Sequence, residues 1–289
     1  MAEHITTAAL GFETTPGGWH RPLGGRVLDF RRLRSRPDLE QTERLQREVF
    51  GVSERDLASF SLLVVVHKTG GEVLGAFDGT RLVGFISGYG GYVTGRPLLV
   101  SDFMAVEPAY RGGLGLALKT LQGAVALAAG FENAIWTVDP LRAANARLNF
   151  ERLGAHCHHY TRDVYGSDFA EGLYGGLPSD RLTISWPLTS PRVAQRLLHG
   201  HSPLPIDALT GIPDYAPGAQ SGDARVAIPG EIDALLAADP SAASAARNRV
   251  REQLEAAFAD GYTITAFAGA PGELMGYYLL ERDFIVVSP

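Results

Sequence analysis

The sequence of 289 residues predicts an α+β fold in which helices flank a mixed central sheet, with a small strand-helix-strand-strand unit at the C-terminus. Three observations predict this class. Short β-rich runs alternate with segments of helical period. A glycine-rich turn carries one strand directly into a helix at residues 100–119. Six prolines from Pro187 to Pro217 prevent continuous regular structure and separate the two parts.

The elements before the glycine-rich segment follow from local signals. Residues 1–25 are rich in Thr, Gly and Pro and have no periodicity, which predicts a flexible N-terminal arm. Further on, Ser35 or Asp38 can cap a first amphipathic helix, and a glycine-containing turn at 78–79 joins two β-rich runs. The expected order is a strand at 27–33, helices at 38–49 and 59–68, and strands at 72–77, 81–87 and 98–106.

After Pro108 the leucines recur at helical spacing among many alanines, which predicts a helix. The C-terminal unit is too small to be secure alone, so we expect it to pack on the main domain or on a partner subunit. The expected elements are a helix at 114–129, a strand at 134–138, a helix at 143–153, strands at 156–162 and 180–188, a short helix at 193–198, a strand at 225–228, a helix at 242–259 and strands at 263–268 and 274–280. The predicted domains are the arm 1–25, a main domain 26–188, a Pro-rich linker 189–222 and the C-terminal unit 223–289.

Composition and charge exclude several function classes. With 45% hydrophobic and 20% charged residues, the chain is typical of a globular enzyme. A net charge of −6 argues against the basic stripe that nucleic-acid binding requires. Neither a signal peptide nor a run of about 20 apolar residues occurs, so no membrane partner is expected and we predict a cytoplasmic protein. The single cysteine, Cys157, excludes internal disulfides.

The segment 100–119 carries the strongest functional signal. A strand runs through a glycine-rich turn into a helix, so unpaired N–H groups and the positive end of the helix point at one place, which suits a phosphate. A P-loop would need Gly-Lys-Ser/Thr here, and a dinucleotide fingerprint would need further βαβ crossovers and a distant acid. Neither is present. A glycine-rich connection without a ligand remains the structural alternative.

The stretch VEPAYRGGLGLA at 106–117 resembles motif A of the GNAT N-acyltransferase superfamily. The stretch DPLRAANARLNFERLGA at 139–155 resembles motif B, in the order and at the separation that the superfamily has. Together with GLPSDR at 176–181, these stretches are similar to a subgroup of predicted acetyltransferases of about this length. The resemblance covers 27–188, and the C-terminal unit more loosely. It implies the GNAT fold.

The resemblance also implies an activity and a donor. The donor is acetyl-CoA or succinyl-CoA, lying where strands 98–106 and 134–138 splay apart, and the acyl group passes by direct attack to the amine of a small molecule such as an amino acid. The pyrophosphate lies on the glycine-rich turn, the pantetheine pairs with the strand before it, and two asparagines face the pantetheine arm. The coenzyme residues implied are Met104, Ala105, Val106, Arg111, Gly112, Gly113, Leu114, Gly115, Leu116, Asn145 and Asn149.

Two departures from the superfamily pattern stand out. Arg111 precedes Gly113 and Gly115 by one residue fewer than usual, which shortens the phosphate turn. Phe150 stands where many relatives have a tyrosine that protonates the departing thiolate, and a phenyl ring cannot donate a proton. These departures motivate an alternative, a degenerate GNAT domain that binds acyl-CoA or a partner subunit, with a homodimer as one form, without turnover.

Direct transfer needs a base for the proton of the amine. Asp102 and Asp139 are the candidates nearest the expected thioester, and Tyr160 or His158 is the candidate acid. Each of the two carboxylates has an alternative role in a solvated contact or a salt bridge.

After a Gly-Gly-Leu-Pro turn come Ser179, Asp180 and Arg181, the candidate substrate-binding residues. Arg181 can hold a carboxylate of an amino acid or of a dicarboxylic acyl group. In the alternative interpretation, Asp180 is a cap and Arg181 forms a surface ion pair. Strand alternation sends His156 and His158 to one face and Cys157 and His159 to the other, so no metal is expected.

Overall fold

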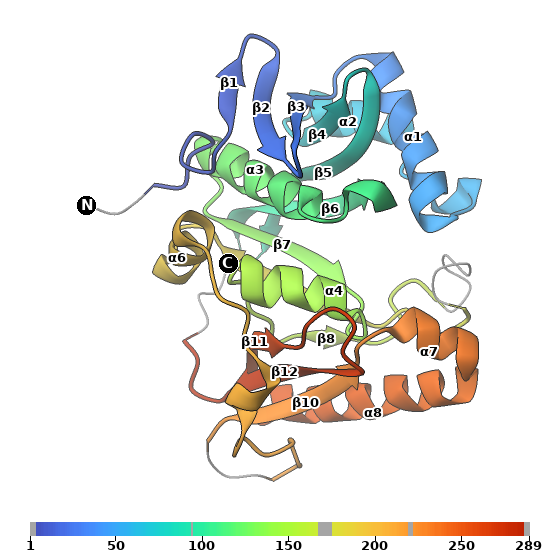
Figure 1. Cartoon of the computed structure of the whole chain (residues 1–289), viewed down its shortest axis with the longest axis vertical. Coiled ribbons are helices and arrows are strands. Elements are labelled where there is room, and N and C mark those ends of the chain that lie inside the picture. The colour runs from blue at the N-terminus through green and yellow to red at the C-terminus, as the bar shows by residue number, and fades with distance from the viewer. Residues whose placement is uncertain (1–3, 94, 167–174, 219–221, 286–289) are drawn as a thin grey trace.

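The computed structural model describes residues 4–93, 95–166, 175–218 and 222–285 (Figure 1). In this part of the chain there are two β-sheets, one of nine strands and one of three. The larger sheet has the spatial order β1 (Glu13–Thr15), β2 (Gly18–Leu23), β3 (Arg26–Arg32), β4 (Glu72–Asp78), β5 (Arg81–Val93), β6 (Arg96–Val106), β7 (Asn133–Val138), β9 (Arg181–Pro187) and β8 (Tyr160–Thr161). The smaller sheet has the order β10 (Ala224–Pro229), β12 (Met275–Glu281) and β11 (Thr263–Ala268).

Helices flank the larger sheet, so the predicted mixed α+β fold is confirmed. The helices are α1 (Arg36–Phe50), α2 (Phe60–Lys68), α3 (Leu114–Ala128), α4 (Ala143–Ala146), α6 (Pro191–His199), α7 (Ile232–Ala238) and α8 (Pro240–Ala259). Short helical turns are η1 (Glu54–Asp56), η2 (Pro108–Tyr110), the π-helical η3 (Arg147–Arg152) and η4 (Ile206–Leu209). Across the described ranges, none of these helices has the length and apolar character needed to cross a membrane.

The two faces of the larger sheet have separate apolar layers. Helix α3 packs Leu114 and Leu118 against one face, where Gly84 of β5 leaves room for it. A Cβ at Gly84 would lie 2.9 Å from Leu114 Cδ2, so the missing side chain allows the close approach. Helices α1 and α2 bury Leu45 and Leu63 with the opposite face. The sheet is thereby covered on both sides around its central strands.

Residues 4–25 of the N-terminal arm contain two strands, in contrast to the prediction of a flexible segment. Strand β2 pairs antiparallel with β3, and β1 extends the sheet by one more strand. Phe12 is buried, and its ring meets that of Phe30 edge to face at 5.2 Å. The sequence pattern did not predict this hairpin because the segment is rich in Gly and Pro. The few apolar residues that stabilise it pack against a strand further along the chain and do not form a periodic pattern within the segment.

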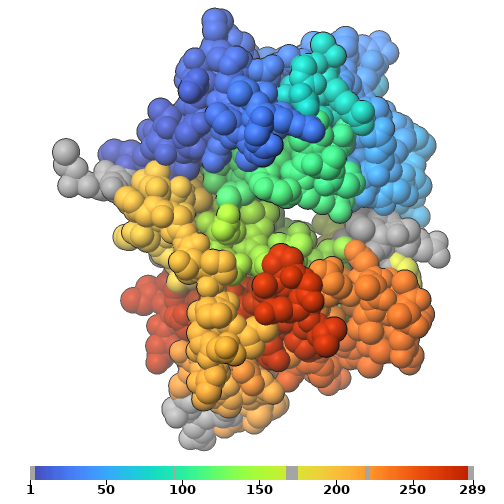
Figure 2. All heavy atoms as spheres, viewed as in Figure 1, coloured from blue at the N-terminus to red at the C-terminus, as the bar shows by residue number. Residues whose placement is uncertain are grey.

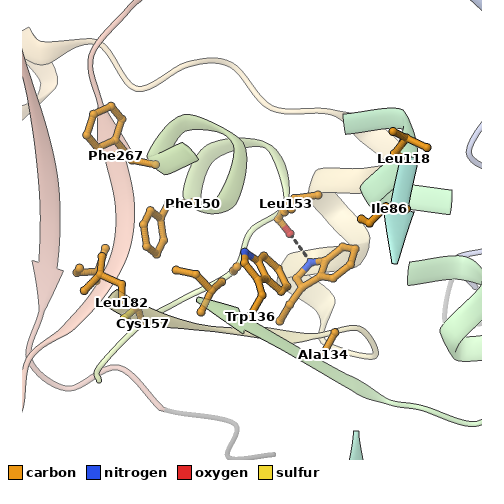
Figure 3. Packing of buried hydrophobic residues seen from close by; sticks show 14 of the residues in the cluster. Ile86, Leu118, Ala134, Trp136, Phe150, Leu153, Cys157, Leu182 and Phe267 are labelled. Carbon is orange, nitrogen blue, oxygen red and sulfur yellow. Dashed lines mark hydrogen bonds between the residues drawn. The ribbon is translucent and has the colours of Figure 1, made fainter. Parts of the chain in front are cut away.

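The C-terminal unit packs on the main domain through a continuous core (Figure 3). Phe150 lies edge to face with Tyr278 at 5.6 Å, and the Tyr278 ring also contacts Phe267. The backbones of Cys157 and Ile264 exchange both N–H···O bonds and so join the two parts of the chain. Helix α7 is an element that the sequence pattern did not predict.

Two segments differ from the expected elements. The strand expected at 156–162 is reduced to β8, because His156 pairs with Ser185 of β9 while the next residue, Cys157, pairs with Ile264 in the C-terminal unit. The Pro-rich segment 189–222 contains α6, as expected, and also η4. It anchors to the core through buried Val193 and Tyr215.

Candidate active site

Strands β6 and β7 are the one parallel pair in the larger sheet of the described chain, and they separate after two residue pairs. Leu99 pairs with Ala134 and Val100 with Ile135, and beyond these residues the strands diverge. At the point of divergence Asp102 is the extra residue of a β-bulge against β5, since Ser87 opposes Phe103 and Gly88 opposes Ser101. Bulges commonly lie next to active sites and turn a side chain in a new direction. The backbone edge of β6 beyond Val100 is therefore available to a ligand.

A cavity of about 500 Å³ lies between the diverging strands. Figure 2 shows a hollow between the green atoms of the α3 region and the yellow-green atoms of the β7–η3 region. Residues 101–104 of β6 form one wall and residues 136–138 of β7 another. Asn145, Leu148 and Asn149 of α4 and η3 close one side, and the loop after α1 closes another. This volume suits the arm of a small-molecule ligand.

Asn149 indicates that the cavity is built for a polar ligand. Its side chain is 2% exposed and lines the cavity, and its Nδ2 has no hydrogen-bond partner within the described residues. Buried amide groups are nearly always hydrogen-bonded, so an orphaned donor at a cavity wall calls for an acceptor from a ligand. The π-helical η3, which holds Asn149, is a geometry often found at functional sites. Both asparagines expected to face the arm, Asn145 and Asn149, lie at this wall.

The glycine-rich turn presents backbone donors beside the cavity. The N–H of Gly113 bonds to Arg111 O at 2.8 Å, and the N–H of Ala117 bonds to Gly113 O. In the described part of the chain, the amides of Gly112, Leu114, Gly115 and Leu116 have no acceptor. Met104, which lines the cavity, has its Cε 3.6 Å from the ideal Cβ position of Gly115, so turn and cavity are neighbours.

Around this turn, the other expected coenzyme residues take different positions. The Arg111 and Gly112 residues are exposed at the start of the turn. Ala105 is buried toward α1 and α2, and Val106 toward α3, so each can offer only backbone groups to a ligand. Free amides at a helix N-terminus suit a diphosphate.

Gly113 and Gly112 provide a matched test of this turn. Gly113 has φ +149°, and Leu23 Cδ1 lies 3.2 Å from its ideal Cβ position, whereas a Cβ on Gly112 meets nothing within 4 Å. Gly113→Ala is expected to weaken CoA binding at least about tenfold, since backbone strain of roughly 1–3 kcal/mol displaces the donors. Gly112→Ala is expected to change it less than about threefold. Calorimetric titration with CoA measures both, and equal affinities would contradict the assignment of this turn to the diphosphate.

Asp102 is the candidate base that reaches the cavity. It is exposed and lies at the bulge, and desolvation by the surrounding cavity wall raises the pKa of its carboxyl. Tyr89 of β5 lies nearby. Burial is the main cause that raises the pKa of its hydroxyl, and the charges of Asp102 and Tyr165 raise it further. Tyr165 also lines the cavity. A carboxylate with a raised pKa at the mouth of a cleft is suited to accept a proton near neutral pH.

The structure places Asp139, the other predicted base, outside the cavity lining. Its carboxylate is 4% exposed, accepts the N–H of Leu141 and forms an ion pair with Arg247 of α8 at 2.7 Å. It is not among the residues that line the cavity. Its part is structural, because a paired and buried carboxylate with no access to the cavity cannot exchange protons with a substrate there.

The structure also places Tyr160, the predicted acid, outside the cavity lining. Its hydroxyl donates to Asp180 Oδ2 at 2.6 Å, and Arg251 of α8 holds the same carboxylate through two N–H groups. Burial and this carboxylate raise the pKa of Tyr160 far above its ordinary value. Neither Tyr160 nor the other candidate, His158, lines the cavity. The Tyr160 hydroxyl is therefore bound to Asp180, the carboxylate that joins the main domain to α8.

The three predicted substrate residues are divided by the fold. Arg181 lines the cavity, and its guanidinium lies 5.0 Å from the centre of the Tyr165 ring. Ser179 is buried, accepts the N–H of Tyr165 and donates to Asp163. Asp180 belongs to the pairing with α8 described above. Of the three residues, only Arg181 is among the described residues that line the cavity.

Lys119 is a cavity residue that the sequence reasoning missed. It is 4% exposed, its Nζ donates to Ser101 Oγ at 2.8 Å, and it lies 3.5 Å from the centre of the Trp136 ring. Ser101 and Trp136 directly follow the last paired residues of β6 and β7, so Lys119 marks the closed end of the opening. Burial lowers the pKa of its ammonium well below the ordinary value. The signal was the spacing of Lys119 and Gln122 within an otherwise apolar helix.

Phe150 and Cys157 belong to the core. Phe150 is fully buried against Tyr278 and is not part of the cavity wall. Burial raises the pKa of the Cys157 thiol to about 12, so the thiol is not ionised at neutral pH. His156 stacks on His158 at 6.2 Å, as strand alternation predicted. Within the described ranges, no cluster of three or more His, Cys, Asp or Glu residues could hold a metal ion.

No protein-family model and no curated protein matches the chain. Similar solved structures include the ribosomal-protein-S18-alanine N-acetyltransferase from Escherichia coli, with 18% identity, coverage of 56% of this chain and 95% of that one, and a TM-score of 0.46. An acetyltransferase of the GNAT family from Streptococcus pneumoniae has 15% identity, coverage of 55% and 98%, and a TM-score of 0.44. An aminoglycoside acetyltransferase from an uncultured soil metagenomic sample, in complex with sisomicin, has 24% identity, coverage of 39% and 78%, and a TM-score of 0.35. At these identities the likeness concerns the fold alone.

Proposed function

We propose that the chain is an acyl-CoA-dependent N-acyltransferase of the GNAT type that acts on the amine of a small molecule such as an amino acid. The observation that carries this proposal is the conjunction of a cavity between diverging strands, an orphaned Asn149 amide in its wall and a row of free amides beside it. The free amides of the glycine-rich turn suit the diphosphate of CoA, Asn149 suits its polar arm, and the cavity between the strands suits the thioester. The shortened turn still offers those amides.

Within this proposal each polar residue has a defined part. The unpaired edge of β6 beyond Val100 offers N–H groups to the thioester carbonyl and to the amides of the arm. Asp102, at the bulge, takes the proton that the attacking amine loses. The carbon–nitrogen bond forms, the carbon–sulfur bond breaks, and the thiolate takes a proton from water. Phe150 cannot supply that proton.

The direct test is thiol release. The protein is incubated with acetyl-CoA or succinyl-CoA and a panel of amines that includes amino acids of both hands, and free CoA thiol is measured against a no-amine control. Amine-dependent release supports the proposal. CoA binding by calorimetry without any release favours a degenerate domain that binds without turnover, the reading suggested by Phe150. Absence of both binding and release contradicts the proposal.

A dicarboxylic acyl group has a specific observation in its favour. The amino group of Lys119 is buried at the closed end of the cavity, burial lowers its pKa well below the ordinary value, and in the described chain no carboxylate pairs with it. A carboxylate at the end of a succinyl group would supply that partner and would raise the lowered pKa of Lys119, because an opposite charge favours the charged form. We therefore favour succinyl over acetyl.

Lys119→Met tests the choice of acyl group. It keeps the length and apolar stem of the side chain and removes the charge. We expect kcat/KM with succinyl-CoA to fall by roughly 10- to 100-fold, as for the loss of a charge-assisted hydrogen bond, while kcat/KM with acetyl-CoA changes much less. Steady-state thiol release with both donors measures the ratio. A parallel loss with both donors would contradict a role for Lys119 in recognising the acyl carboxylate.

A further inference from the structure

A second cavity, of about 690 Å³, adjoins the first and has no part in the steps above. Four apolar residues of α2 line it, namely Leu62, Leu63, Val65 and Val66. The other described residues of its wall are Thr69, Gly70, Tyr89, Gly90, Asp102, Ala129 and Phe131. Leu62 and Val65 are 48% and 55% exposed, which is unusual for consecutive turns of one apolar helix. An exposed apolar surface next to a cleft indicates a ligand contact.

The two cavities meet at Asp102. Asp102 and Leu62 line both of them, so the junction joins a carboxylate to an apolar wall. Asp102 is the one acidic residue of the second cavity among the described residues, and the other polar groups there are Thr69 and the Tyr89 hydroxyl. A molecule with an ammonium at one end and a hydrocarbon group at the other matches this arrangement, because its charge pairs with Asp102 while its apolar part leaves water.

We propose that the second cavity holds the apolar group of the acceptor, so that the acceptor class is a primary amine with an aliphatic or aromatic side chain whose nitrogen lies at Asp102. This inference rests on the proposed N-acyltransferase function and deepens it. Asp102 first accepts one proton from the bound ammonium, and the neutral amine then attacks the thioester carbon in the first cavity. The carbon–sulfur bond breaks, and the second proton of the nitrogen passes through water to the thiolate.

The acyl chain is the competing occupant, and the electrostatics of the first cavity argue against it. The closed end of that cavity is formed by Ser101, Trp136 and the buried amino group of Lys119. The carboxylate of the proposed succinyl group pairs with Lys119 there, which keeps the acyl group in the first cavity. The second cavity, whose wall has no cation among the described residues, is left to the acceptor. The apolar group therefore belongs to the acceptor side.

Two homologous series separate the occupants. The acceptor series runs from glycine through 2-aminobutyrate to norleucine, with the matching n-alkylamines, and the donor series runs from acetyl-CoA to hexanoyl-CoA. We expect kcat/KM to rise roughly fourfold for each methylene added to the acceptor until the cavity is filled, from the free energy of burying a CH₂ group. Norleucine should exceed glutamine, which has a similar length and a polar end. The donor series should not rise.

A matched pair of variants ties the preference to α2. Val65→Asn makes the second cavity polar at a half-exposed position, and Val27→Asn changes an exposed valine of β3 that lies outside both cavities. Val65→Asn is expected to lower the norleucine-to-glycine ratio of kcat/KM by roughly tenfold, with the affinity for CoA unchanged as evidence of an intact fold. Val27→Asn is expected to leave the ratio as it is.

The outcomes distinguish this inference from the function on which it rests. Thiol release that is flat or falls along the acceptor series, or that rises along the donor series instead, overturns the inference alone. An unchanged ratio in Val65→Asn with normal CoA affinity does the same. CoA binding without release for any amine of either kind overturns the inference and favours the non-catalytic alternative. Absence of both release and CoA binding overturns the N-acyltransferase function itself.

Discussion

Asp102→Asn is expected to lower kcat/KM for acyl transfer by roughly 10²- to 10⁴-fold, the usual effect of removing a general base. The substitution keeps the size and the hydrogen-bonding capacity of the side chain, so the bulge between β5 and β6 and the cavity wall should remain intact. The affinity for CoA is therefore expected to change little. Thiol-release kinetics and calorimetry on the same preparation measure the two quantities.

The pH profile gives the same prediction an independent readout. Burial raises the pKa of Asp102, so the acid limb of kcat/KM should lie at a higher pH than the value of about 4 of an ordinary carboxyl. Activity is lost as the pH falls through this raised pKa, because a protonated base cannot accept the proton of the amine. The limb should disappear in Asp102→Asn.

Asp56→Asn is the matched control for this prediction. Asp56 lines the same cavity from η1, but its carboxylate accepts a hydrogen bond from Ser53 Oγ. We expect its loss of activity to be at least ten times smaller than that of Asp102→Asn. Equal losses in the two variants, or an unchanged acid limb in Asp102→Asn, would contradict the role of Asp102 as base.

Arg247→Leu is expected to lower the free energy of unfolding by about 3–5 kcal/mol, the second large effect. Arg247 of α8 and Asp139 after β7 form an ion pair at 2.7 Å in which the side chains are 1% and 3% exposed. Removing the guanidinium leaves the buried carboxylate with the N–H of Leu141 as its remaining donor. Chemical denaturation followed by tryptophan fluorescence measures the change.

Two comparisons make this stability prediction specific. The double variant Asp139→Asn/Arg247→Leu removes both charges and is expected to regain most of the loss. Arg162→Leu breaks an ion pair with Glu255 that also joins the main domain to α8 but has a largely exposed arginine, and it should cost at most about 1 kcal/mol. A loss in the double variant as large as in Arg247→Leu would mean that packing, rather than charge, accounts for the effect.

Local signals were sufficient for most elements of the main domain. Ser35 and Ser59 cap α1 and α2, each accepting an N–H of the first helical turn. The hairpin of β4 and β5 turns at Gly79 and Thr80, between the paired residues Asp78 and Arg81, one residue later than the sequence placed it. Such elements are predictable because their caps, turns and apolar periods lie within a few residues. The hairpin of β1 and β2 was not predicted, because it packs through the contact of Phe12 with Phe30 of β3, which lies outside the hairpin.

In the same way, the sequence by itself determined the glycine-rich turn and the two asparagines of the cavity wall. Gly113 must adopt a positive φ at the helix start, and Asn145 and Asn149 are one helical turn apart and so share a face. These properties depend on spacing along the chain, and the resemblance to the GNAT superfamily was recognised from that spacing.

Only the tertiary structure showed which of the two candidate bases lines the cavity and revealed Lys119 there. Asp102 lies within β6 and Asp139 directly follows β7, but Asp139 meets Arg247, 108 residues further along the chain, while Asp102 lies at a bulge and lines the cavity. Lys119 is buried against Ser101 and Trp136, the residues that directly follow the last pairs of β6 and β7. Whether a charged group is paired, solvated or exposed to a cavity depends on residues that folding brings together from distant positions, and local sequence patterns do not contain that information.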